Sequence, residues 1–121
     1  MRLPARPPFT LTILVLAFTI LLSACQPGGK ERSERTPPAV GVHDVAARDL
    51  QFEPPAVQVR PGTTVTWHFD DGAVPHDVKA AGFASGIQKA GTFQHRFDRP
   101  GTYTYRCTLH TDMTGRVIVS G

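Results

Sequence analysis

The stretch that decides the fold reads TYTYRCTLHTDMTGRVIV and occupies residues 102–119. Two segments in which apolar and polar residues alternate flank a short loop, as expected for two β-strands joined by a turn. On the first strand Tyr103, Tyr105 and Cys107 share one face, so the sulfur is expected to point inward with the aromatic rings. The loop then places an imidazole at His110 and a thioether at Met113, in steps of three residues.

A thiolate, an imidazole and a thioether are the ligand types that suit copper in both of its common oxidation states. A histidine further upstream, His76, would complete a site with two imidazoles, one thiolate and a weak axial thioether. Each residue also has an ordinary role, because a lone Cys is usually a small buried apolar residue and Met often fills gaps in a core. The Cys-x2-His-x2-Met spacing between two strand patterns favours a metal site over these separate roles.

These residues resemble the ligand loop of the type 1 (blue) copper proteins, the cupredoxin family of the plastocyanin and amicyanin kind. The similarity runs from about residue 44 to residue 120 and includes Phe52-x-Pro54, GTTVTW at 62–67 and PHDV at 75–78. It implies one copper ion cycling between Cu(I) and Cu(II), with His76, Cys107 and His110 as equatorial ligands and Met113 as the long axial ligand. It also implies a one-electron carrier rather than an enzyme.

Three residues beside the expected ligands are predicted to tune the site: Asp77, Thr108 and Leu109. Asp77 stands where the family usually has Asn, so a group that only accepts hydrogen bonds replaces one that can also donate. Its negative charge would lower the redox potential, or its oxygens would accept backbone N–H groups and clamp the Cys107 loop. Leu109 stands where the family often has Pro, and its backbone N–H could point at the Cys107 sulfur. Asp112 also departs from the small or aromatic residue expected there.

The remaining histidines are weaker ligand candidates. Strand alternation turns His68 outward, while His95 shares a face with Phe93 and Phe97 and is expected to be partly buried and hydrogen-bonded. His43 precedes the first predicted strand and is expected to be solvated.

Residues 1–24 have the pattern of a signal peptide. Arg2 and Arg6 precede an apolar run of about 16 residues, which is shorter than the roughly 20 needed to span a membrane. The run ends in Leu22-Ser23-Ala24-Cys25, which resembles a bacterial lipobox, so Cys25 is expected to be lipidated. The prediction is an exported protein, lipid-anchored to a bacterial membrane and facing the periplasm or the cell exterior. An ordinary signal peptide with an incidental Cys, or an uncleaved anchor, are the alternatives.

Residues 25–41 are rich in Pro, Gly and charge, which predicts a lipid-anchored flexible tether. Residues 42–121 are predicted to form an all-β, cupredoxin-like copper-binding domain, a two-sheet Greek-key sandwich of about seven strands. Residues 80–91 are the least regular and are expected to form a loop. The predicted strands lie near 44–50, 56–60, 63–69, 76–80, 92–97, 102–107 and 115–119, and the predicted core residues are Trp67, Phe69, Phe93, Phe97, Tyr103, Tyr105, Val117 and Val119.

The resemblance further implies that the electron leaves through the exposed edge of His110. The predicted partners are therefore redox proteins that dock against an apolar rim around this edge. The candidate rim residues are Ala73, Val74, Pro75 and Leu109. Residues 42–121 carry eight basic and eight acidic side chains, so no nucleic acid partner is indicated, and a monomer is expected.

The competing function is a copper-binding chaperone or storage protein without redox turnover, although such proteins favour Met-rich or His-rich tracts and this chain has 2 methionines. A multicopper enzyme would need further copper ligands, typically a His beside the Cys. A metal-free immunoglobulin-like domain would leave the Cys-His-Met spacing unexplained.

Overall fold

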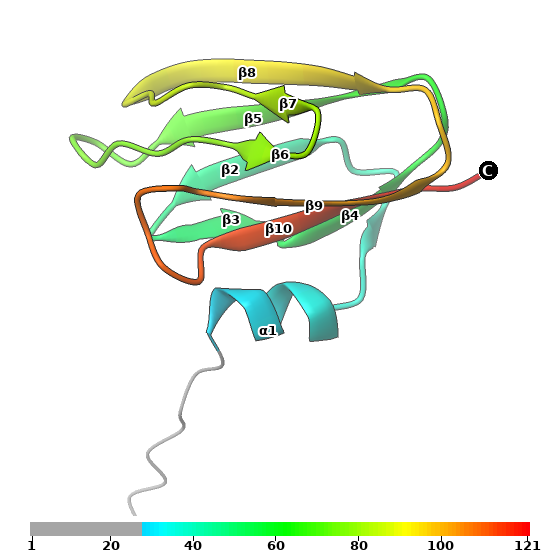
Figure 1. Ribbon diagram of the computed structural model, residues 1–121, viewed down its shortest axis with the longest axis horizontal. Helices are drawn as coiled ribbons and strands as arrows, with labels where there is room; N and C mark the ends of the chain where they lie inside the picture. The colour runs from blue at the N-terminus through cyan, green and yellow to red at the C-terminus, as the bar shows by residue number, and fades with distance from the viewer. Residues whose placement is uncertain (1–27) are drawn as a thin grey trace, which may run out of the picture.

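The computed structural model describes residues 28–121, which form two packed β-sheets with one short helix beside them (Figure 1). The elements in chain order are α1 (Gly29–Arg35), β1 (Ala39–Val40), β2 (Asp44–Arg48), β3 (Gln51–Glu53), β4 (Ala56–Val59), β5 (Thr63–Asp70), β6 (Lys79–Ala80), β7 (Phe83–Ala84), β8 (Ala90–Phe97), β9 (Gly101–Arg106) and β10 (Thr114–Val119). One sheet has six strands in the order β1-β4-β10-β9-β6-β7, and the other has four in the order β3-β2-β5-β8.

Strand alternation produces the two-layer core. Along β5 the side chains of Val65, Trp67 and Phe69 are buried while their neighbours face outward, and β10 repeats this pattern with Val117 and Val119. The chain crosses between the sheets several times, because β4, β9 and β10 lie in one sheet and β2, β5 and β8 in the other. The predicted all-β, two-sheet Greek-key sandwich is therefore confirmed.

Trp67 and Tyr105 join the two layers at the centre of the core. Their rings meet edge to face, with centroids 5.2 Å apart, and Phe52 also packs edge to face against Tyr105, with centroids 4.8 Å apart. Gly115 pairs with Tyr105 across β9 and β10, and a Cβ at Gly115 would collide with the tyrosine ring. The predicted core is confirmed, since Trp67, Phe69, Phe97, Tyr105, Val117 and Val119 are buried and Phe93 and Tyr103 pack against them half-buried.

Three short strands were not predicted among the described residues: β1, β3 and β7. Each has only two or three residues, too few to show alternation in the sequence. The segment 80–91, expected to be a loop, contains β7, which pairs with β6 at the edge of the larger sheet. The rest of that segment up to β8 is irregular, as predicted.

The prediction of a flexible tether is wrong for residues 29–40. Helix α1 packs beside β10, and β1 adds to the sheet next to β4. Ser33 is buried and donates to the Pro55 carbonyl oxygen at 3.2 Å. Arg116 donates from β10 to the carbonyl oxygens of Glu34 and Thr36, at 2.9 and 3.0 Å. Polar contacts with distant parts of the chain, and not apolar burial, therefore order this segment.

Within residues 28–121 there is no helix whose length and apolar character would let it cross a membrane.

Candidate metal centre

The four predicted ligands come from two segments at one end of the sandwich. His76 lies just before β6, whereas Cys107, His110 and Met113 lie in the loop between β9 and β10. Strand β6 pairs with β9, with Lys79 opposite Arg106, so the two segments leave the sheet side by side.

The backbone of His76 is held by a pair of hydrogen bonds to Gln88. The His76 N–H donates to the Gln88 carbonyl at 2.9 Å, and the Gln88 N–H donates to the His76 carbonyl at 2.8 Å. His76 is fully buried, which is unusual for a polar side chain without a structural or chemical role. The imidazole therefore has a fixed starting point and little room to rotate.

The loop 107–113 closes on itself at its base. The Cys107 N–H donates to the Met113 carbonyl at 2.9 Å, and the Met113 N–H donates to the His110 carbonyl at 3.3 Å. Asp112 adopts a left-handed backbone with φ of 66°, which Asp tolerates better than most residues. These bonds turn the chain so that Cys107 and Met113 both point inward, where they are 3% and 1% exposed.

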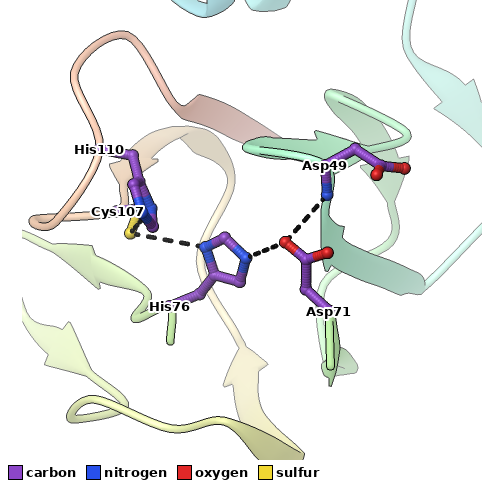
Figure 2. Close-up of polar contacts among 5 residues, drawn as sticks. All are labelled: Asp49, Asp71, His76, Cys107 and His110. Carbon is purple, nitrogen blue, oxygen red and sulfur yellow. Dashed lines mark hydrogen bonds and ion pairs between the residues drawn. The ribbon is translucent and has the colours of Figure 1, made fainter. Parts of the chain in front are cut away.

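The donor atoms of three predicted ligands converge (Figure 2). The Cys107 sulfur lies 3.5 Å from Nδ1 of His110 and 4.0 Å from Nδ1 of His76. All three donors lie within 4.8 Å of one another, and Cys107 is a free thiol. In a trigonal site, the metal bonds are about 2.0 Å long to nitrogen and about 2.3 Å long to sulfur. The sulfur would then lie about 3.7 Å from each of the two nitrogens. The observed separations lie on either side of this value, so the residues present fit a metal ion.

Asp71 is a site residue that sequence reasoning missed. Its Oδ2 lies 2.8 Å from Nε2 of His76, on the far side of the ring from Cys107, and also accepts the backbone N–H of Asp49 at 3.1 Å (Figure 2). The hydrogen bond with His76 is the main reason why the pKa of the Asp71 carboxyl lies below its ordinary value. The carboxylate favours the tautomer with the proton on Nε2, which leaves Nδ1 free to bind a metal.

The Asp77 carboxylate binds the start of the ligand loop. Its Oδ1 accepts the Thr108 N–H at 2.6 Å, and its Oδ2 accepts the Thr108 hydroxyl at 2.7 Å. Asp77 is 6% exposed and Thr108 lies at the surface, so these are charge-assisted bonds between a buried carboxylate and a surface residue. Of the two roles considered for Asp77, the structure shows the contacts that clamping requires.

The other candidates lie outside the cluster. Leu109 is exposed at the surface next to His110, and Cys25 falls outside the described residues. His68 points outward and bonds to Asp44 at 2.8 Å, as alternation predicts. His95 is half-buried as expected, but it stacks on Phe83 with centroids 4.3 Å apart, and its ring makes no hydrogen bond to any residue of the described range 28–121.

A β-sandwich that holds two imidazoles and a thiolate together, with a buried thioether in the same loop, defines a mononuclear copper centre of the cupredoxin type. Comparisons with known proteins agree. Residues 39–120 match the family of copper binding proteins described as plastocyanin/azurin. Amicyanin-alpha of Methylorubrum extorquens is 30% identical over 122 residues, which cover 92% of this chain and 95% of that protein. Amicyanin of Paracoccus denitrificans is 33% identical over 81 residues, which cover 58% and 59% of the two chains.

Solved structures show the same fold. A purple cupredoxin from Nitrosopumilus maritimus matches with a TM-score of 0.59 and 28% identity, over 65% of this chain and 100% of the other. A reduced amicyanin variant matches with a TM-score of 0.59 and 30% identity, over 66% and 83% of the two chains. The chain belongs to the plastocyanin/azurin family of copper-binding proteins. It is therefore a type 1 copper protein with one copper ion and functions in one-electron transfer.

Proposed function

We propose that this copper protein is a lipid-anchored carrier at the outer face of a bacterial membrane and exchanges electrons through His110. The observation that carries the proposal is the contrast in burial among the four residues that would hold the copper. His76, Cys107 and Met113 are 0–3% exposed, whereas His110 is half-buried and reaches the surface. An electron therefore has its shortest route to a partner through the His110 ring.

The apolar surface around His110 supports docking of a redox protein. Val74 and Leu109 are 38% and 42% exposed, Ala73 is exposed, and Pro75 is half-buried. Exposed apolar side chains near a buried functional group are typical of an interaction surface. Such a surface brings a partner close to His110 and excludes water from the contact.

The residues around the site keep the donor atoms in place while the charge of the site changes. When bound, copper supplies one-electron chemistry by alternating between Cu(I) and Cu(II). Asp71 holds the His76 ring, the Gln88 pair holds its backbone, and Asp77 holds the start of the loop. Because both segments are tied to the sandwich, electron transfer requires little movement of the protein.

Copper titration of the purified protein tests the carrier function against the chaperone or storage alternative. We expect Cu(II) to give an intense blue absorption from thiolate-to-copper charge transfer, and voltammetry to show a reversible one-electron couple. A colourless Cu(II) complex, or tight Cu(I) binding without a reversible couple, would favour the chaperone or storage function.

Export and anchoring are tested on the full-length chain in a bacterial host. The lipobox-like sequence before Cys25 supports acylation of that residue, and a diacylated N-terminus is held stably in a bilayer. Cys25→Ser should shift the protein out of the detergent phase on phase separation, or leave the precursor unprocessed. Processed Cys25→Ser protein that still enters the detergent phase would contradict the lipid anchor.

A further inference from the structure

The N-terminal end of the described chain lies against the copper-ligand loop. A Cβ on Gly29 would collide with the Asp112 carbonyl oxygen, and a Cβ on Gly28 would lie 3.4 Å from an Asp112 carboxylate oxygen. Figure 1 shows the start of α1 below the loop that joins β9 to β10. The chain therefore enters the domain at the end that carries the predicted ligands.

Contacts along α1 hold this entry point in place. Ser33 is buried against the Pro55 carbonyl, Arg32 bonds to Gln51 and Glu53, and Arg116 binds two carbonyls at the end of the helix. With α1 docked, the sandwich cannot turn freely about a long linker.

Chain length then limits how far the ligand loop can lie from an anchor at Cys25. Cys25 precedes Gly28 by three residues, which span at most about 11 Å when fully extended. The opposite end of the sandwich is the end where Gly121 packs near Pro61. It is further from Cys25 than the copper end is, by the length of β10, about 17 Å. An anchor at Cys25 therefore brings the copper end close to the bilayer.

We infer that the anchored protein presents its copper end to the membrane that holds it, and that its electron partner is a redox protein embedded in that same membrane. The inference rests on the lipid anchor proposed above. Exposed apolar side chains gather at this end, since Ile87, next to the Gln88 partner of His76, is 63% exposed in addition to Val74 and Leu109. The docking surface of the partner is accordingly apolar and opens at the bilayer surface. A partner diffusing in the compartment meets the opposite end of the sandwich first.

Fluorescence resonance energy transfer from a dye on the protein to a dye in the membrane measures this orientation. The full-length lipidated protein, with copper reduced, is reconstituted in vesicles that contain an acceptor dye on the lipid headgroups. A donor dye is placed at Lys89, near the copper end, or at Gly121. We expect stronger transfer from position 89 than from position 121. Equal transfer, or stronger transfer from position 121, would overturn the inference.

Two changes should weaken or abolish the orientation while leaving the anchor intact. Twelve Gly/Ser residues inserted between Gln26 and Pro27 add a reach of about 17–21 Å and should make transfer from the two positions equal. Gly29→Ala should reduce the difference, because its methyl group displaces the start of α1 from Asp112. Gly28→Ala is the matched control and should keep the difference, since its methyl group fits. An insertion variant that keeps the full difference would show that the short connection between Cys25 and Gly28 does not orient the domain, and would overturn the inference.

The rate at which a soluble oxidant reaches the copper of the vesicle-bound protein tests whether the partner is embedded in the membrane. A soluble oxidised redox protein should oxidise the copper of the anchored protein much more slowly than the copper of Cys25→Ser protein. The insertion should restore the oxidation rate of the anchored protein. An unchanged rate would contradict a membrane-embedded partner. Binding of processed Cys25→Ser protein to protein-free vesicles would contradict it as well, because lipid itself would then occupy the apolar surface. Blue protein with equal transfer from both dyes refutes only the orientation, whereas protein that is not blue or not membrane-bound refutes the proposed function as well.

Discussion

Replacing Asp77 by Asn should weaken the clamp on the ligand loop without changing its shape. Asp77 accepts two bonds from Thr108, at 2.6 and 2.7 Å. An Asn side chain can accept the Thr108 N–H with its oxygen and donate to the Thr108 hydroxyl with its nitrogen, so both bonds survive as neutral ones. A bond to a charged group contributes about 1.5–3 kcal/mol, against about 1 kcal/mol for a neutral one. Because Thr108 is at the surface, we take the lower end and expect the free energy of unfolding to fall by about 1–2 kcal/mol.

The same substitution removes a negative charge next to a predicted copper ligand. A negative charge stabilises Cu(II) more than Cu(I), so Asp77→Asn should also raise the redox potential. Each tenfold change in the one-electron equilibrium corresponds to about 59 mV. Thr108→Val is the matched control, because it removes the hydroxyl bond while keeping the carboxylate charge and the backbone bond. It should lower stability and leave the potential nearly unchanged.

Denaturant unfolding of the copper-free proteins and voltammetry of the copper-loaded proteins separate the two effects. An Asn variant with unchanged unfolding free energy would refute the clamp. An unchanged or lowered potential would refute the electrostatic role of Asp77. If Thr108→Val moves the potential as much as Asp77→Asn does, the hydrogen bond and not the charge sets the potential.

Three further sets of substitutions test the site and the fold. Cys107→Ala should abolish the blue absorption, whereas Met113→Leu should keep the colour and raise the potential, because losing a weak donor harms Cu(II) more; a blue Cys107→Ala protein would contradict the ligand assignment. Asp71→Ala frees the His76 ring and should weaken copper binding by about 10–100-fold in chelator competition; unchanged affinity would show that the hydrogen bond does not position the ligand. Leu50 has a left-handed backbone, with φ of 57°, in the two-residue turn between β2 and β3. Leu50→Gly should raise the unfolding free energy by about 1 kcal/mol in urea, and a loss of stability would argue against strain at this turn.

Local sequence patterns, namely strand alternation and the spacing of residues in one loop, predicted part of the fold and of the site. Alternation in residues 63–69 and 102–119 placed Trp67 and Tyr105 in the core, and the loop spacing selected Cys107, His110 and Met113 as candidate ligands. His76 is six residues after the end of β5 and 31 residues before Cys107, so only chemistry and the family resemblance linked it to the loop.

The missed features depend on contacts between distant residues. Asp71 bonds to His76 through a turn whose shape no local pattern reveals, and its second donor, Asp49, is 22 residues away. Helix α1 has seven residues, follows Pro27-Gly28, is followed by Pro37-Pro38 and has no apolar stripe, so propensity alone predicts no stable helix. It is ordered by Arg116, which lies 82 residues beyond Glu34.

The bond between Arg116 and α1 has a consequence for the order in which the chain acquires structure. Strand β1 pairs with β4, β4 lies beside β10, and α1 is held by a residue of β10, the last of the described strands in chain order. The N-terminal part therefore cannot reach its final position until the C-terminal residues are present. Such sequence-distant pairings make folding slow compared with folding through local contacts.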